Sequence, residues 1–359
     1  MKVAFIVRST LDTVSGGDSV QIHETAKHLK KLGLEVDIYK TTETIQYDHY
    51  NLLHFFNLIR PADIIRHIHK TKIPFVLTPV WIDYSEYDKR HRKGFAGMMF
   101  RFVNEEKVEY FKTIARWLMR RDVWPGGSYL LKGQKSSMRE VLSKTAMLLP
   151  GTSLEYQTLS TVFGIQKNYS IVPLGVNEEI FVTKKEINKD PLLLLCVARI
   201  EGIKNQLNLI RAVNGTKYKL ILIGRAAPNH LSYYKQCRKE AGSNISFVDH
   251  LPQEKLADYY SRAKVHILPS WYENCGLSTL EAAALQCNVV VSNRGFISEY
   301  LGEHAFYCDP SSPDSILQAI EHAANAPVNS VLQNKIIASY TWNKVAETTF
   351  TAYQKLLAS

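Results

Sequence analysis

The stretch HILPSWYENCGLSTLEA, residues 266–282, has the pattern of a buried strand, a short loop and a helix. The apolar run ends at Pro269, the loop carries Glu273, and helical spacing begins near Gly276–Leu277. The first N–H groups of a helix have no partner within the helix and lie at its positive dipole end, so they suit a phosphate. Glu273 and Glu281 flank this position, where carboxylates can accept hydrogen bonds from vicinal sugar hydroxyls. For Glu281, early in the helix, complementation of the helix dipole is the alternative.

Short apolar runs alternate with helical patterns on both sides of this stretch. The strands predicted in the second half of the chain are LLLLCVA (192–198), YKLILIG (218–224), ISFVD (245–249), KVHILP (264–269) and NVVVS (288–292). The helices predicted there span residues 204–214, 230–241, 253–261 and 277–286. The first half predicts a helix at 18–32 and the strands KVAFIV (2–7), EVDIYK (35–40), NLLHFF (51–56), PFVLT (74–78), AMLLP (146–150) and YSIVPLG (169–175).

This alternation predicts parallel sheets whose faces are both covered by helices. We therefore predict an α/β fold with two tandem Rossmann-like domains and an active-site cleft between them. The polar stretch 176–191 has no strong period and is interpreted as the connection. The predicted domains are 1–175 and 176–341, and the helical segment 342–359 is expected to pack back on the first domain.

Glycines and cations follow two of the predicted strands, at the edge where open parallel sheets bind ligands. Gly16 and Gly17 precede a helix and let backbone N–H groups approach an anion or a sugar hydroxyl; a flexible turn is the alternative. The fingerprint G-x-G-x-x-G is absent there, which argues against a nicotinamide-binding domain. Arg199 and Lys204 bridge a strand–loop–helix turn and could flank a diphosphate, although two solvated surface cations would give the same pattern.

The composition narrows the class of protein. The chain has 359 residues, which is too many for one compact core. Its residues are 45% apolar and 22% charged, and this composition excludes disordered and coiled-coil proteins. No apolar run reaches the roughly 18 residues of a spanning helix, and MKVAFIVRST is too short and too soon polar for a secretory signal. Five cysteines without a C-x-x-C pair argue against a disulfide framework or a structural zinc site and favour a reducing cytosol.

Positive charge is concentrated in residues 85–145. Fourteen Lys and Arg stand there against seven Asp and Glu, so seven of the ten net charges fall in about a sixth of the chain. Such an excess suggests an anionic partner: a membrane surface, nucleic acid or a phosphorylated substrate. Within this segment a helical pattern has an apolar face and a basic face. The apolar face holds Phe111, Ile114, Ala115 and Leu118, and the basic face holds Lys112, Arg116 and Arg120. This pattern fits a basic amphipathic helix that contacts lipid, and it also fits an ordinary pair of surface helices.

The spacing of Glu273 and Glu281 in the context P-S-x-x-E-x-x-G-L-x-x-L-E-A resembles the E-x7-E signature of family-4-type retaining nucleotide-sugar glycosyltransferases of the GT-B fold. The resemblance spans nearly the whole chain. Segments similar to family motifs are the glycine loop 15–18, the strand end 53–58, the linker 171–181, the diphosphate segment 197–205 and the nucleobase turn 247–251. The chain departs from the family pattern at Leu174, Ala198 and Asp249, and the stretch 77–83 lacks the histidine that many members carry.

The resemblance implies roles for individual residues. Glu273, Arg199 and Lys204 are expected to be catalytic. Donor binding is expected from Glu281, Asn274, Cys275, Gly276, Leu277, Ser278, His250 and Leu251. Gly16, Gly17 and His54 are expected at the acceptor or sugar, although His54 could also be a hydrogen-bonded histidine at a strand end.

We therefore expect a retaining hexosyltransferase that uses a UDP- or GDP-sugar as substrate and needs neither cofactor nor metal. The chain contains no Asp-x-Asp pair, so Arg199, Lys204 and the helix start would stabilise the diphosphate. The expected acceptor is a glycan or lipid-linked glycan of cell-surface polysaccharide or glycolipid assembly, and the expected location is the cytoplasm, with contact to the inner membrane face as an option. A sugar-nucleotide epimerase and a basic nucleic-acid-binding protein are the alternatives; the lack of a recognised module argues against the latter.

Overall fold

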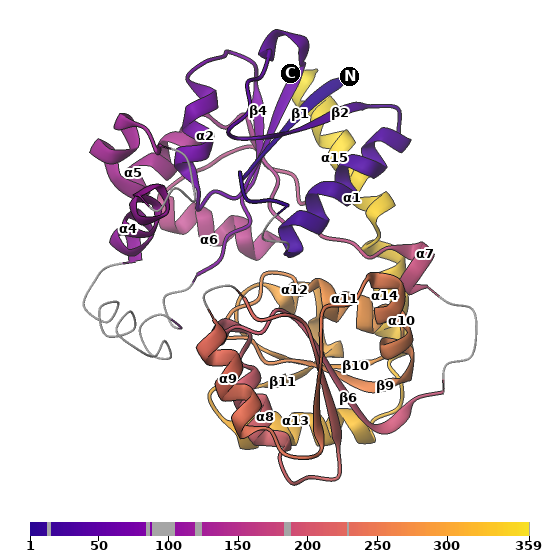
Figure 1. Cartoon of the computed structure of the whole chain (residues 1–359). Helices are drawn as coiled ribbons and strands as arrows, with labels where there is room; N and C mark the ends of the chain where they lie inside the picture. The colour runs from indigo at the N-terminus through magenta and orange to yellow at the C-terminus, as the bar shows by residue number, and fades with distance from the viewer. Residues whose placement is uncertain are drawn as a thin grey trace. The chain divides into compact units, whose positions relative to one another are not determined.

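The computed structural model describes residues 1–12, 16–83, 87, 105–118, 124–182, 188–227 and 230–358. These residues form two compact α/β units, which Figure 1 colours from indigo to yellow along the chain. The N-terminal unit holds the described residues up to Leu174 together with those from Trp342 onward, and the C-terminal unit holds Gly175–Thr341. The sequence analysis placed the two boundaries after residues 175 and 341.

The N-terminal unit contains five strands and the helices that cover them. Its elements are β1 (Lys2–Val7), α1 (Gly17–Lys31), β2 (Glu35–Lys40), η1 (Tyr47–His49), β3 (Leu52–Phe56), α2 (Pro61–Ile68), β4 (Phe75–Thr78), α4 (Glu105–Leu118), α5 (Gly127–Lys144), β5 (Met147–Leu148), α6 (Ser153–Phe163) and α15 (Trp342–Leu357). The strands pair in parallel in the order β2-β1-β3-β4-β5. The predicted strands in residues 2–78 and 146–150 are therefore present.

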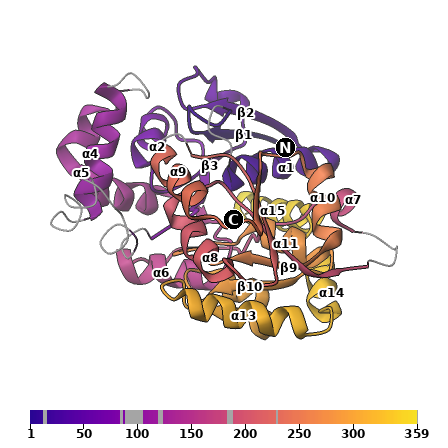
Figure 2. The same ribbon diagram turned by 60° about the horizontal axis from the view of Figure 1, so that its bottom comes forward.

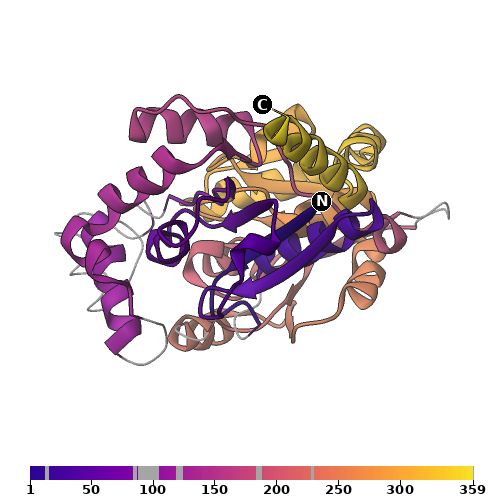
Figure 3. The same ribbon diagram turned by 90° about the horizontal axis from the view of Figure 1, so that it is seen from above.

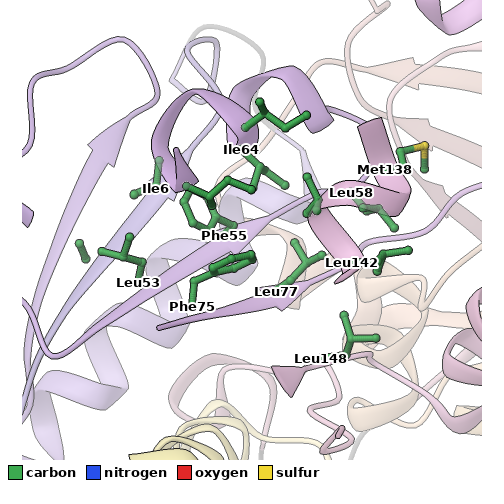
Figure 4. Packing of buried hydrophobic residues seen from close by; sticks show 14 of the residues in the cluster. Ile6, Leu53, Phe55, Leu58, Ile64, Phe75, Leu77, Met138, Leu142 and Leu148 are labelled. Atoms are coloured by element: carbon green, nitrogen blue, oxygen red, sulfur yellow. The ribbon is translucent and has the colours of Figure 1, made fainter. Parts of the chain in front are cut away.

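Two adjacent residues of β3 show how the faces of this sheet are covered. Successive side chains of a strand point to opposite faces. Phe55 belongs to an apolar cluster with Met138 and Leu142 of α5 and with side chains of α2 (Figure 4). His54 instead contacts Tyr353 of α15. Helices α2 and α5 thus pack on one face, and α15 packs on the other beside α1 (Figure 3).

The C-terminal unit contains six strands. Its elements are α7 (Glu178–Phe181), β6 (Asp190–Val197), η3 (Gly202–Lys204), α8 (Gln206–Val213), β7 (Lys219–Ile223), α9 (Leu231–Glu240), β8 (Ile245–Val248), α10 (Gln253–Arg262), β9 (Ala263–Leu268), α11 (Leu277–Ala284), β10 (Asn288–Ser292), α12 (Ile297–Leu301), η4 (Gly302–His304), β11 (Phe306–Cys308), α13 (Pro313–Asn325) and α14 (Ser330–Ser339). Helix α8 packs against α9 and α13 (Figure 2).

The strands of the C-terminal unit pair in parallel in the order β11-β10-β9-β6-β7-β8. β6 is the first of these strands along the chain, and the fourth, β9, lies next to it. The chain therefore adds β7 and β8 on one side of β6 and β9, β10 and β11 on the other. The loops that leave the carboxyl ends of the neighbouring strands β6 and β9 therefore run in opposite directions. This place, where the strand order reverses, is the switch point at which open parallel sheets bind ligands.

The structure corrects two predictions of secondary structure and adds elements that were not predicted. Residues 169–175 form no strand; Tyr169 makes a single bridge to Leu148, and Pro173 has no N–H to donate to a ladder. The connection 176–191 contains α7, whose first turn Asn177 caps by accepting from the Glu179 N–H. Strand β11 and helices α13 and α14 were not predicted.

Candidate functional site

The loops after β6 and β9 meet at the switch point of the C-terminal sheet. The Nζ atom of Lys204, at the end of η3, lies 2.6 Å from Oε2 of Glu273 in the loop after β9. The Oγ of Ser270 donates to the same carboxylate oxygen at 3.1 Å. Both ion-pair partners are largely buried, so water screens this pair less than an exposed one. The structure thus brings together two of the three residues predicted to be catalytic.

Two backbone contacts fix the loops that carry this ion pair. The Trp271 N–H donates to the carbonyl of Ile203 at 2.8 Å, next to Lys204. Asn205, buried, donates from Nδ2 to the carbonyls of Pro269 and Pro310 at 3.1 and 2.7 Å. The contacts with Trp271 and Pro269 join the loop after β6 to the loop before Glu273, and the contact with Pro310 ties it to the loop after β11, so these loops fix the separation of Lys204 and Glu273.

Arg199, the third residue predicted to be catalytic, lies just beyond the end of β6. Its guanidinium lies 3.0 Å from Oε1 of Glu201, and its side chain is 44% exposed, against 20% for Lys204. Glu201 is buried, so the solvent-exposed partner of this pair is the Arg199 side chain. Arg199 is therefore more accessible to a ligand and less restrained than Lys204.

The backbone of Glu273 is held by the loop after β10. Its N–H donates to the Arg294 carbonyl at 3.2 Å, and its carbonyl accepts from the Phe296 N–H at 2.9 Å. Between them, Gly295 has φ of +83°, and a Cβ atom there would lie 2.3 Å from the carbonyl oxygen of Glu273. Only glycine allows this approach without a shift of the backbone.

Helix α11 begins directly after the loop that follows β9 and carries Glu273. Gly276 is its N-cap residue in a left-handed conformation with φ of +70°, and it makes no side-chain capping bond. The helix start therefore offers the N–H groups that follow Gly276, including those of Leu277 and Ser278, to an anion. Asn274 and Cys275 precede the helix; Cys275 is buried, and Oδ1 of Asn274 is buried without a hydrogen-bond partner among the described residues.

Glu281 lies one turn further along α11 and faces α10. Its Oε1 accepts from Nε2 of Gln253 at 3.0 Å, and its Oε2 accepts from the Tyr260 hydroxyl at 3.1 Å. Burial raises the pKa of Glu281 to about 7, against the lowering effect of the Tyr260 and Gln253 hydrogen bonds.

The predicted nucleobase turn joins the same group of loops. His250 and Leu251 follow β8, and Gln253, which bonds Glu281, is the first residue of the helix after them. Asp249 accepts from Nε of Arg225 at 2.8 Å and from the His250 N–H at 2.7 Å. The residues predicted to bind the donor thus all lie in the segments that follow β8 and β9, including the first two turns of α11.

The N-terminal unit gives a different result for His54. Its side chain is buried, with Nδ1 2.6 Å from the Tyr353 hydroxyl and Nε2 2.8 Å from Oγ1 of Thr78. Burial lowers the pKa of His54 to about 3. Both ring nitrogens are occupied inside the unit, as the alternative of a hydrogen-bonded strand histidine expects, and a contact of His54 with the acceptor or a sugar stays a prediction.

Gly16 and Gly17 lie at the start of α1. Gly16 is the N-cap residue with an extended backbone, φ of −161°, that any residue can adopt. Asp18, in the first turn, accepts from Nε and Nη2 of Arg8 at 2.7 and 3.1 Å, so the residue after β1 is tied to the helix start. Residues 13–15 of this loop lie outside the described residues, and the role of the two glycines stays a prediction.

Sequence reasoning missed the residues that hold the site together. Ser270, Asn205, Gln253 and Tyr260 bond the predicted side chains or their loops, and Gly295 permits the approach to Glu273. Ser270 and Asn205 stand inside the quoted motifs, so their positions were available as a signal. Gln253, Tyr260 and Gly295 become visible only when the loops are brought together in space.

His266 of β9 is a buried histidine whose ring nitrogens have no hydrogen-bond partner among the described residues. Burial lowers the pKa of His266 to about 3. The folded unit therefore keeps His266 neutral, while the unfolded chain binds a proton below about pH 6.5, so His266 favours unfolding increasingly as pH falls through this value.

We expect the His266→Leu variant to lose less stability than the wild type between pH 6.5 and 5, by about 2 kcal/mol at pH 5. Urea unfolding at a series of pH values measures the difference. His250→Leu, at an exposed histidine, is the matched control. Parallel pH profiles for wild type and His266→Leu would contradict the expectation.

Among the described residues there is neither a metal-binding cluster nor a membrane-spanning helix. No group of three or more His, Cys, Asp or Glu there could hold a metal ion. None of the helices formed by these residues is both long and apolar enough to cross a bilayer.

Known proteins with similar sequences and folds were compared with the chain. Residues 177–338 match the family model described as "Glycosyl transferases group 1". The chain is 22% identical to an MMP α-(1→4)-mannosyltransferase of Mycolicibacterium hassiacum, covering 96% of each protein. It is 26% identical to the O-antigen chain mannosyltransferase B of Escherichia coli over 44% of this chain and 42% of that one. A sucrose-phosphate synthase of Thermosynechococcus elongatus has the same fold, with a TM-score of 0.76 and 16% identity over 100% of this chain and 99% of that one.

The matched region contains every residue of the site at the switch point, from Arg199 to Gly295. These similarities do not favour an epimerase or a nucleic-acid-binding protein. The chain is therefore a GT-B glycosyltransferase, an enzyme that transfers a sugar from a nucleotide-sugar donor, and its residues 177–338 are the part that the group 1 family describes.

Proposed function

We propose that this glycosyltransferase moves a hexose from a UDP- or GDP-sugar to a glycan or lipid-linked acceptor with retention of anomeric configuration and without a metal ion or cofactor. The observation that carries the proposal is the Lys204–Glu273 ion pair beside the start of α11. The names of the two mannosyltransferases, one of O-antigen chains, support a role in cell-surface polysaccharide or glycolipid assembly.

The chemistry follows from where charge develops. As the bond between the anomeric carbon and the diphosphate breaks, negative charge grows on the leaving phosphate, and groups held in place beforehand stabilise it most effectively. Lys204 has three N–H donors and uses one toward Glu273, so two remain for phosphate oxygens. Arg199 and the free N–H groups of α11 add to this stabilisation.

Retention requires the acceptor hydroxyl to attack on the face from which the diphosphate departs. A diphosphate oxygen then accepts the hydroxyl proton, so the reaction needs no dedicated protein base. Glu273 holds Lys204 and can accept hydrogen bonds from the hydroxyls of the sugar being transferred. Glu281 accepts from vicinal hydroxyls of the donor.

Two measurements test this mechanism directly. We expect transfer from a UDP- or GDP-sugar to continue at an unchanged rate in excess EDTA, because cations of the chain neutralise the diphosphate. We also expect NMR of the new linkage to show the anomeric configuration of the donor. Loss of activity in EDTA with recovery in Mg²⁺ or Mn²⁺ would reject metal independence, and an inverted product would reject retention.

The acceptor or its surroundings are proposed to be anionic. The excess charge of residues 85–145 supports this, although 84–86, 88–104 and 119–123 lie outside the described residues. Helices α4 and α5 pack together. This region of the surface carries exposed cations, such as Lys132 and Arg139, and exposed apolar side chains. The exposed apolar residues are Phe111, Leu118, Trp124 and Leu131, of which Leu131 is 91% exposed. On an anionic membrane surface, such apolar side chains can enter the lipid–water interface while the cations contact the anionic headgroups. These residues therefore fit a contact with the inner face of a membrane.

We expect Leu131→Glu to weaken binding to phosphatidylglycerol-containing vesicles about tenfold, since a leucine that enters the interface contributes about 1.5 kcal/mol or more. Co-sedimentation measures it. Leu231→Glu, at an exposed leucine of the C-terminal unit, is the control. Reversal of Arg116, Arg120 and Arg121 to Glu tests the electrostatic part; these side chains lie outside the described ones. Wild-type protein that ignores such vesicles at low salt would reject a membrane surface as partner.

A further inference from the structure

The two oxygens of the Glu281 carboxylate have different partners. Oε1 accepts from Gln253, and Oε2 accepts from Tyr260, both on α10. Each carboxylate oxygen has about two acceptor positions, so one remains open on each oxygen. Two open positions on neighbouring oxygens match a vicinal diol, in which each hydroxyl donates to one oxygen.

Tyr260 is fixed more firmly than the bond to Glu281 alone requires. Its side chain is fully buried, and its ring lies edge-on to Phe181 and His266, with centroids 6.0 and 5.8 Å away. Its carbonyl accepts from Nζ of Lys189 at 2.6 Å, which anchors the end of α10. A tyrosine has few rotatable bonds, so a buried ring held on two sides keeps its hydroxyl at one place.

Gln253 restrains the carboxylate from the other end of α10. It is the first residue of this helix and follows the His250–Leu251 segment closely in sequence. One side of the Glu281 carboxylate is therefore tied to a rigid aromatic residue and the other to the turn predicted to lie near the nucleobase. A truncation of either partner would leave one oxygen without its donor and let the carboxylate turn about its Cγ–Cδ bond.

We propose that Tyr260 and Gln253 are positioning residues that hold the Glu281 carboxylate with one acceptor position open on each oxygen, so that it binds a vicinal diol of the nucleotide-sugar. This inference rests on the proposed function, which assigns Glu281 to the donor. The diol belongs either to the nucleotide ribose or to the transferred sugar. The two sources present the same chemistry and are separated by the choice of ligand.

The test is calorimetry of the full chain with UDP, GDP, their 2′,3′-dideoxy analogues and the corresponding sugar nucleotides. We expect Tyr260→Phe and Gln253→Ala each to weaken binding of the diol-bearing ligand about fivefold, the equivalent of about 1 kcal/mol for one hydrogen bond. Affinity for a ligand that lacks the diol stays unchanged, which a general structural defect would not allow. Tyr307→Phe, which loses the 2.6 Å bond from its hydroxyl to the Gly302 carbonyl, is the matched control.

The pattern across ligands identifies the source of the diol. If the variants lose affinity for UDP or GDP but not for the dideoxy analogue, the diol belongs to the ribose. If they lose affinity for the sugar nucleotide alone, the diol belongs to the transferred sugar. Both results support the inference. If Glu281→Gln weakens binding but Tyr260→Phe and Gln253→Ala do not, the positioning role is overturned while the donor role of Glu281 stands. If Glu281→Gln has no effect either, the donor role in the proposed function fails together with the inference.

Discussion

Replacing Lys204 by alanine is expected to lower kcat/KM about 10- to 100-fold, since a hydrogen bond to a charged group contributes about 1.5–3 kcal/mol. The substitution removes the ammonium proposed to stabilise the leaving phosphate. It also leaves the Glu273 carboxylate with Ser270 as its remaining side-chain donor among the described residues. Steady-state kinetics with the preferred sugar nucleotide measure the loss, and calorimetry with UDP or GDP separates binding from turnover.

Arg199→Ala is expected to cost less than Lys204→Ala. The Arg199 guanidinium is more exposed, and water and salt replace part of its contribution. Lys219→Ala, at an exposed lysine on the first position of β7, is the control for loss of one charge from the unit. Unchanged kinetics in Lys204→Ala, or an Arg199→Ala effect larger than that of Lys204→Ala, would place the diphosphate away from the ion pair.

Gly295→Ala is expected to lower kcat at least about tenfold and to reproduce the effect of Glu273→Gln. A methyl group at Gly295 would overlap the Glu273 carbonyl and force the loop after β9 to move. A shift of about 1 Å in a catalytic loop is enough for losses of this size. The left-handed backbone at Gly295 adds about 1 kcal/mol of strain for alanine.

Gly215→Ala separates the strain of a positive φ from the overlap with the Glu273 carbonyl. Gly215 also has a positive φ, +72°, but a Cβ there would meet nothing within 4 Å. Both variants are expected to melt at lower temperature, and only Gly295→Ala is expected to lose turnover. If both variants keep wild-type kcat, the contact between Gly295 and Glu273 does not position the catalytic loop.

Much of the fold could be predicted because most strands are apolar runs bounded by glycine, proline or polar residues. Strands β6, β7 and β10 illustrate this, since each is an almost continuous run of Leu, Ile or Val. β11 has only three residues, too few to establish a period. The predicted strand 169–175 was wrong because apolar content gives no information on whether a neighbouring strand offers a ladder of partners.

Helix α13 carries a start signal that the sequence analysis did not use. Ser312 caps it by accepting from the Ser315 N–H, and Pro313 occupies the first turn. The site residues were predicted from motif spacing, and two of them, Lys204 and Glu273, are in contact. The partners of Glu281 could not be predicted, because Gln253 and Tyr260 reach it from a different helix through the packing of α10 on α11. The partner of His54 could not be predicted either, because Tyr353 lies 299 residues away in sequence.

The return of α15 to the N-terminal unit has a consequence for the order of events during synthesis. Tyr353, the partner of His54, and the helix that packs on α1 are translated after the whole of the C-terminal unit. Residues 175–341 are contiguous and can fold as soon as they leave the ribosome, whereas the N-terminal unit lacks α15 until residues 342–358 emerge. The N-terminal unit is therefore completed last, and the side chains of α1 and β3 that contact α15 stay exposed on the nascent chain until then.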